Sequence, residues 1–212
     1  IELIDNYNPD VVYFDDTALP LWPVSNVGLE IAAHYYNKSI KDNKGKLEAV
    51  ITGKILDEQQ RKCMIWDIER GQSNRIEPEP WQTCTCIGSW HYDRRVYDRG
   101  HYKSAKTVIH MLVDVVSKNG NLLLSVPMRG DGSVDDKARA TVEGIANWMQ
   151  LNSEAIIGTR PWHTFGEGPA IAHAPELHAQ GFNEGRGKPL VAEDYRFTQK
   201  GKSLYAFVMG QP

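Results

Sequence analysis

Residues 104–127, SAKTVIHMLVDVVSKNGNLLLSVP, carry the strongest structural signal in the chain. Ser104 is a favourable N-cap, and apolar residues then recur at helical spacing. These residues are Val108, Ile109, Leu112, Val115 and Val116. Asn119-Gly120 is typical of a helix C-terminus, and the apolar run 122–126 is typical of a strand buried on both faces. The stretch therefore predicts a helix followed closely by a buried strand.

The same alternation continues on both sides of this stretch. Three further strands are predicted at residues 11–14, 48–55 and 81–87, and two further helices at 29–40 and 135–151. The residues between 67 and 80 are predicted to form a long loop. Buried strands that alternate with helices favour an α/β fold with parallel strands.

The chain is too short for a complete eight-stranded barrel of this kind. A whole (β/α)8 TIM-like barrel takes about 250 residues, whereas the alternation here stops near Gly158. Four strands therefore fit either a small open sheet or the second half of a barrel. Beyond Pro161 glycine and proline become frequent, and residues 195–208 predict two short strands that begin an antiparallel sheet.

Composition excludes several classes of function. The 212 residues include 24 Lys and Arg and 27 Asp and Glu, a net charge of −3, so no basic excess indicates a nucleic-acid partner. Apolar stretches are far shorter than the roughly 20 residues that span a bilayer. The start at Ile1 shows no signal-peptide pattern, and three cysteines argue against a disulfide framework.

Acidic residues that follow the predicted strands are the first candidates for chemistry. Asp15 and Asp16 follow the strand at residues 11–14, and Glu69 lies in the loop after the next one. Catalytic groups of α/β barrels lie at the carboxyl ends of strands, and a pair of carboxylates is what glycoside hydrolysis requires. Acids in these positions are also common as helix caps or as solvated loop residues.

Aromatic residues near the same loops are candidates for binding a sugar ring. They are Tyr13, Trp66, Trp81, Trp90 and Tyr92. Aromatic rings cover the apolar faces of sugars, although packing in the core explains most tryptophans. Cys84 and Cys86 share one face of a strand, but no third ligand has a suggestive spacing, so we expect no metal site.

Several segments, in order, resemble the α-L-fucosidases of glycoside hydrolase family 29. Residues 8–15, NPDVVYFD, are similar to the segment of that family that ends in the nucleophile. Residues 80–84, PWQTC, and 89–92, SWHY, are similar to a later strand and loop. Residues 112–126, LVDVVSKNGNLLLSV, and 148–158, WMQLNSEAIIG, match its last barrel segments. The resemblance covers about residues 1–162.

The resemblance implies a retaining exo-α-L-fucosidase that acts on fucosylated glycans by double displacement and needs no cofactor. It implies that Asp15 is the nucleophile and that Glu69 is the general acid/base, with Glu77 and Glu79 as alternatives in the same loop. Lys54 stands where the family often holds the sugar with an Asn-Asp-Arg segment. Tyr13 and the other four aromatic residues are expected to bind substrate.

The resemblance also implies a domain organisation. Residues 1–160 correspond to the C-terminal half of the barrel, and residues 161–212 to the truncated start of a C-terminal β-sandwich-like domain. Because such a half-barrel exposes strand edges, we expect a homo-oligomer. A signal peptide on the parent chain would favour a periplasmic or secreted location over the cytoplasm.

Two other functions remain open at this point. In the first, the chain is an inactive or sugar-binding half-barrel that needs a partner or a second copy. In the second, it is an inverting carbohydrate-active enzyme that uses Asp16 and Glu79.

Overall fold

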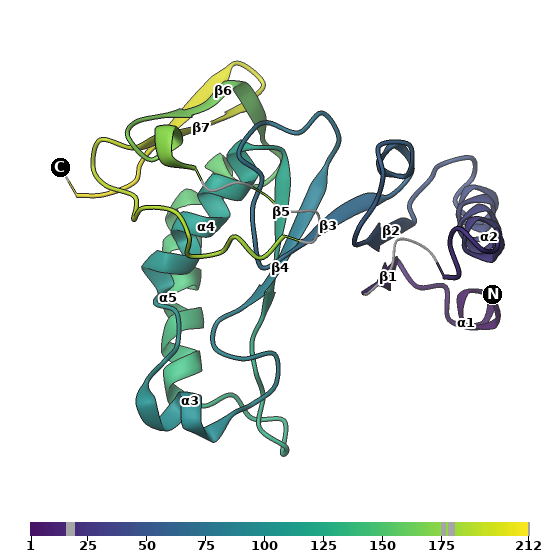
Figure 1. Ribbon diagram of the computed structural model, residues 1–212, viewed down its shortest axis with the longest axis horizontal. Helices are drawn as coiled ribbons and strands as arrows, with labels where there is room; N and C mark the ends of the chain where they lie inside the picture. Colours follow the sequence, from purple (N-terminus) through teal and green to yellow (C-terminus); the bar gives the residue numbers. More distant parts are fainter. Residues whose placement is uncertain (16–19, 175–176, 178–180, 212) are drawn as a thin grey trace. The chain divides into compact units, whose positions relative to one another are not determined.

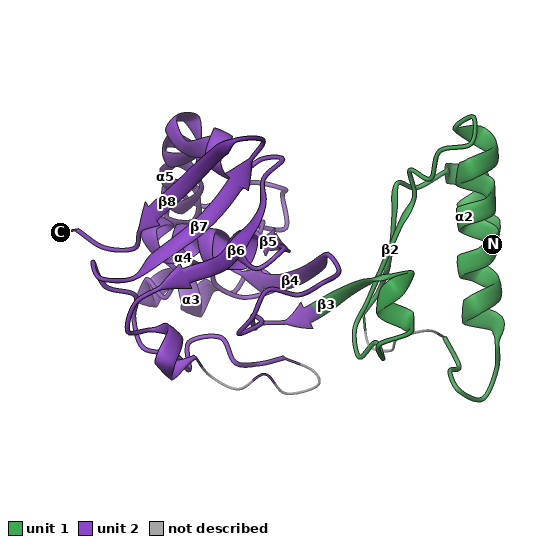
Figure 2. Cartoon of the chain, turned by 90° about the horizontal axis from the view of Figure 1, so that it is seen from above, with its two compact units in different colours: residues 1–67 green, residues 68–212 purple. Residues whose placement is uncertain are grey.

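The computed structural model describes residues 1–15, 20–174, 177 and 181–211. The chain forms two compact units, Ile1–Asp67 and Ile68–Pro212 (Figure 2). The division falls inside strand β3, which is Ile65–Glu69. The change from parallel to antiparallel strands comes much later, before β6 at Arg160.

Unit 1 is a strand–helix–strand segment with parallel strands. Its elements are α1 (Glu2–Tyr7), β1 (Val11–Phe14), α2 (Val27–Asp42), β2 (Val50–Gly53), the 3-10 turn Gln60–Lys62 and the first residues of β3. Tyr13 and Phe14 of β1 pair with Thr52 and Gly53 of β2. Helix α2 buries Ala32 and Tyr35, and the Tyr35 hydroxyl donates a hydrogen bond to the Pro9 carbonyl. The predicted helix at 29–40 and strand at 11–14 are confirmed, and the strand predicted at 48–55 is found over the shorter range Val50–Gly53.

Unit 2 begins with the end of β3 and continues the parallel pattern. Its further elements are β4 (Trp81–Cys86), α3 (Arg94–Arg99), α4 (Ala105–Ser117), β5 (Gly120–Ser125), α5 (Asp136–Asn152), the 3-10 turns Ser153–Ala155 and Ile171–His173, β6 (Arg160–Glu167), β7 (Tyr195–Lys200) and β8 (Ser203–Val208). Ser104 caps α4 by accepting from the Thr107 amide, and Asp135 caps α5 in the same way from Ala138. The helices and strands predicted in this part of the chain are confirmed.

The parallel strands have the order β1-β2-β3-β4-β5, and β6-β7-β8 form a separate antiparallel sheet. The predicted fold class, the C-terminal half of a TIM-like barrel followed by an antiparallel β-domain, is confirmed. Within unit 2, helix α4 lies between β4–β5 and the β6–β7 sheet (Figure 1). Val113, Ile156 and Met209 form a core that joins α4 to the antiparallel sheet. Every helix in the described ranges is too short or too polar to cross a bilayer.

Two predicted features were wrong or incomplete. Residues 67–69 were predicted to lie in a loop, but they belong to β3, so Glu69 ends a strand. Strand β6 was not predicted, because it starts in Arg160-Pro161 and alternates polar and aromatic residues without a clear apolar run.

Candidate active site

In unit 1, Asp15 and Lys54 follow two neighbouring parallel strands. Asp15 comes directly after β1, and Lys54 directly after β2. Carboxyl ends of parallel strands lie at one edge of a sheet, so the two side chains meet there. Lys54 Nζ donates to Asp15 Oδ1 over 2.7 Å, and the lysine side chain is only 14% exposed. The Asp15 side chain is 69% exposed, so its carboxylate faces solvent.

Tyr13 links this pair to a second, buried carboxylate. Its hydroxyl donates to Asp67 Oδ2 over 2.7 Å and lies 3.5 Å from Asp15 Oδ1. Asp67 is on β3, its side chain is fully buried, and its Oδ2 is 3.9 Å from Lys54 Nζ. Both described contacts of Asp15 are therefore made at one oxygen, Oδ1. Asp67 thus lies beside Lys54, which holds Asp15, and accepts from Tyr13; sequence reasoning missed it.

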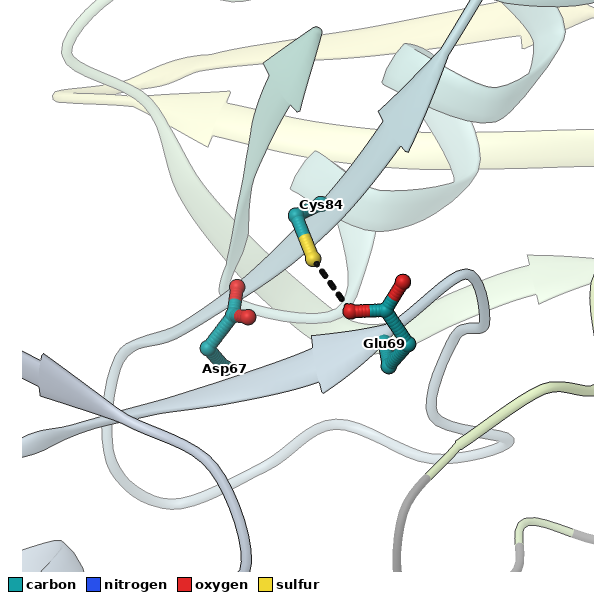
Figure 3. Close-up of side chains that lie close together, drawn as sticks. All are labelled: Asp67, Glu69 and Cys84. Carbon is teal, nitrogen blue, oxygen red and sulfur yellow. Dashed lines mark hydrogen bonds between the residues drawn. The ribbon is translucent and has the colours of Figure 1, made fainter. Parts of the chain in front are cut away.

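In unit 2, Glu69 lies at the end of β3 with 9% of its surface exposed. Cys84 Sγ on β4 donates to Glu69 Oε2 over 3.2 Å (Figure 3). Figure 3 also shows Asp67 two residues earlier on the same strand. Glu69 and Cys84 thus place one carboxylate and one thiol side by side at this point of unit 2.

A segment far along the chain holds the backbone around Glu69. The Phe182 amide donates to the Glu69 carbonyl over 2.7 Å, and the Glu184 amide donates to the Arg70 carbonyl over 2.9 Å. Gly181 forms a parallel bridge with Glu69, and a Cβ at Gly181 would come within 2.3 Å of the Glu69 carbonyl oxygen. Only glycine therefore permits this close approach.

Glu184 is a half-buried acid that sequence reasoning also missed. Its Oε2 accepts from Thr85 over 2.6 Å, its Oε1 lies 2.6 Å from Lys103 Nζ, and Arg70 is 3.7 Å away. Burial raises the pKa of this carboxyl, but Lys103 and Thr85 outweigh that effect and leave the pKa lowered. Glu184 thus links Arg70, the residue that follows Glu69, to Thr85 of strand β4.

The two alternative acids have different surroundings. Glu77 is buried and accepts from Ser73 Oγ over 2.6 Å and from Arg75 Nε over 3.1 Å, so it organises its own loop. Glu79 is exposed between Pro78 and Pro80. Of the three candidates, Glu69 alone lies at the end of a parallel strand.

The aromatic candidates separate into buried and accessible rings. Trp81 is 1% exposed, and its Nε1 donates to the Lys118 carbonyl, so it is a core residue and offers no face to a sugar in this structure. Trp66 is 6% exposed and lies 3.5 Å from the Arg61 guanidinium carbon. Trp90 and Tyr13 are exposed at 40% and 37%. Tyr92 is half-buried, with the Arg129 guanidinium 5.7 Å from its ring.

Carboxylates at the carboxyl ends of parallel strands, such as Asp15 in unit 1 and Glu69 in unit 2, are typical positions for catalytic groups in α/β barrels. Comparison with known proteins identifies the family. The sequence profile described as alpha-L-fucosidase matches residues 1–154. The chain therefore belongs to the α-L-fucosidase family.

Individual relatives agree with this assignment. The chain is 26% identical over 178 residues to the tissue α-L-fucosidase of Bos taurus, covering 78% of this chain and 35% of the relative. It is 29% identical over 168 residues to a putative α-L-fucosidase of Caenorhabditis elegans, covering 76% of this chain and 33% of the relative. The chain thus spans about a third of the length of the curated relatives it matches.

Solved structures show the same fold. A structure of the Thermotoga maritima α-fucosidase in complex with a mechanism-based inhibitor matches with a TM-score of 0.68 and 26% identity, over 97% of this chain and 40% of that one. Another α-L-fucosidase structure matches all of this chain and 41% of its own, with a TM-score of 0.72 and 25% identity.

Proposed function

We propose that this chain carries the two catalytic carboxylates of a retaining exo-α-L-fucosidase, which releases terminal L-fucose from fucosylated glycans. The observation that supports this most strongly is the setting of Asp15. It follows β1 within the family match, its side chain is 69% exposed, and its Oδ1 is held by Lys54. The reaction uses no cofactor.

Asp15 is the nucleophile in this proposal. Lys54 holds Oδ1, which orients the carboxylate for attack on the anomeric carbon through its other oxygen. The C–O bond to the aglycone breaks as the bond to Asp15 forms, and a covalent fucosyl-enzyme results. Asp67 lies beside Lys54 and accepts from the Tyr13 hydroxyl.

Glu69 is the general acid/base. It protonates the leaving oxygen in the first step, and its carboxylate then takes a proton from the water that releases fucose. Cys84 and the Phe182 amide hold its side chain and backbone in place. Retention requires the two carboxyl groups to come within about 5–5.5 Å of each other.

Chemical rescue of two variants tests both roles. The chain is assayed on an aryl α-L-fucoside with Asp15→Gly and Glu69→Ala alongside the wild type. We expect each variant to lose at least about three orders of magnitude in kcat/KM, consistent with loss of a group that acts in the transition state. Azide should then give the β-fucosyl azide with Asp15→Gly and the α-fucosyl azide with Glu69→Ala.

Matched substitutions separate these roles from a general loss of structure. Asp42→Asn changes an exposed acid of unit 1 that pairs only with Lys38 in the described contacts, and it should leave turnover unchanged. Glu79→Gln should also leave it unchanged. Full activity of Asp15→Gly would contradict the nucleophile assignment. Loss of activity in Glu79→Gln but not in Glu69→Ala would assign the acid/base role to Glu79.

The inverting alternative is distinguished by the product. Asp16 lies outside the described residues, and Glu79 is exposed. Proton NMR of the first-formed fucose should show the α-anomer; a β-anomer would exclude Asp15 as a nucleophile.

The exposed edges of the parallel sheet favour a second candidate, a half-barrel that is completed by a partner or a second copy. Val11 on edge strand β1 is 54% exposed, and Leu123 on edge strand β5 is 49% exposed. Residues of parallel strands are normally covered on both faces. A wild-type chain without turnover that forms a homo-oligomer in light scattering would support this candidate, and a stable, active monomer would contradict it.

A further inference from the structure

Unit 2 contains a cavity of about 510 Å³ along one face of helix α4. Thr107, His110, Asp114 and Lys118 line it at intervals of three and four residues, so they share that face. Arg196, residues of the turn Ile171–His173 and residues 187–190 also line it. The volume lies within the range of small-molecule binding sites.

The floor of this cavity has an excess positive charge. Lys118 Nζ and Arg196 Nε each lie 2.6 Å from a different oxygen of Asp114, and all three side chains are at most 5% exposed. The Phe165 ring lies beside both cations, 4.9 Å from Lys118 Nζ and 5.6 Å from the Arg196 guanidinium carbon. Two buried cations are thus balanced by one carboxylate.

The rest of the lining adds to the same excess. Lys103 pairs with Glu184, and Lys106 and Lys188 line the cavity without forming an ion pair to any described residue. Five cations therefore face two carboxylates, an excess of three positive charges in a chain whose net charge is −3. Such concentration of one sign in a concave, low-dielectric site attracts the opposite charge.

Burial and neighbouring charges together change the pKa of groups that line the cavity. Burial lowers the pKa of His110, and the charges of Lys106 and Arg196 lower it further. Burial also lowers the pKa of Lys118 despite the adjacent Asp114. An unbalanced buried cation is costly, and an anion in the cavity would offset that cost.

We propose that this cavity binds a sulfate or phosphate group, either as the free anion or as an ester on a sugar. Arg196 supplies the planar donor, because its Nε and Nη1 are used by Asp114 and the Tyr195 carbonyl while Nη2 makes no hydrogen bond to a described residue. Lys118 supplies charge at the floor, and Lys106 and Lys188 close around the anion from the rim. The volume leaves room for a monosaccharide beside the anionic group.

Calorimetric titration of the full chain tests the proposal at constant ionic strength maintained with chloride. The probes are inorganic sulfate, inorganic phosphate and galactose 6-sulfate, with galactose as the neutral control. We expect saturable binding at one site. The double variant Lys106→Gln/Lys188→Gln should weaken it at least tenfold, whereas Lys202→Gln, an exposed lysine in the turn between β7 and β8, should not.

A second variant tests the floor of the cavity without breaking the fold. Lys118→Met keeps the aliphatic stem and removes the excess charge, so it should also weaken binding. Tighter binding of galactose 6-sulfate than of inorganic sulfate assigns the site to an ester, and equal binding assigns it to the free anion. Absence of saturable binding to all three probes, or affinity unchanged in both the double variant and Lys118→Met, overturns the proposal.

Discussion

The buried charge cluster of unit 2 predicts an asymmetric response to substitution. Asp114 balances both Lys118 and Arg196 at 2.6 Å, and all three side chains are at least 95% buried. Asp114→Asn leaves two buried cations without a counter-charge. Lys118→Met instead leaves a neutral Asp114–Arg196 pair and fills the same space with an apolar chain.

The magnitudes follow from the cost of a buried, unpaired charge. Removing one partner of a buried ion pair costs about 3–5 kcal/mol, whereas replacing a buried charged group with a well-packed apolar one is often neutral or stabilising. Asp114→Asn should therefore lower the free energy of unfolding by about 3–5 kcal/mol. In a chain of this size that corresponds to roughly 10 °C in Tm. Lys118→Met should change it by less than about 1.5 kcal/mol.

Urea denaturation measures both variants, with near-UV circular dichroism reporting on the buried tryptophan Trp81 of unit 2. Asp98→Asn is the control, since it breaks an exposed pair with Arg94 on a helix and such pairs contribute little to stability. Equal losses in Asp114→Asn and Lys118→Met would refute the reasoning, because the cluster would then act as a balanced network rather than one with an excess cation.

Two further predictions concern pH and packing. The pKa of His110 is lowered in the folded state, so the unfolded chain takes up a proton first as the pH falls below about 6.5. The free energy of unfolding should therefore decrease in that pH range. His110→Gln should flatten this part of a plot of urea midpoint against pH. A Cβ at Gly120 would come within 2.6 Å of the Trp81 ring, so Gly120→Ala should lower the free energy of unfolding by about 1–3 kcal/mol in urea, whereas Gly130→Ala, with nothing within 4 Å, should not.

The sequence predicts those elements that carry their own local signals. Helix α4 was found from its N-cap and its apolar spacing, and β5 from an uninterrupted apolar run. Helix α5 was predicted at 135–151 from its apolar spacing, and the structure adds that Asp135 is its N-cap. In each case the residues that determine the structure lie within the element, so a short window of sequence contains the necessary information.

Strand β3 shows why the rest was not predicted. Its sequence, IWDIE, contains two acids, which are unfavourable in a buried strand unless they have partners. Asp67 has its partner in Tyr13, 54 residues earlier, and Glu69 has one in Cys84, 15 residues later. Neither partner can be inferred from the sequence of the strand alone, so its polar residues indicated a loop.

The same limit applies to the aromatic residues. The sequence places Trp81 and Trp90 equally close to the predicted loops. The structure separates them, because the Trp81 Nε1 finds an acceptor 37 residues away and the ring is then buried, whereas Trp90 stays 40% exposed. The role of a tryptophan thus depends on whether the fold supplies an acceptor for its N–H group.

The setting of Glu69 depends on residues beyond the segment that defines the family. The family match ends at residue 154, yet Gly181, Phe182 and Glu184 hold the end of β3 through its backbone and through Thr85 and Lys103. The close approach at Gly181 requires a glycine, and the Glu184 carboxylate has its partners in Thr85 of β4 and in Lys103, just before α4. A proposed acid/base catalyst is therefore positioned by a C-terminal segment that lies outside the sequence motifs of the barrel. Substitutions in that segment should therefore disturb the setting of Glu69 more than that of Asp15, whose described ion pair is with Lys54.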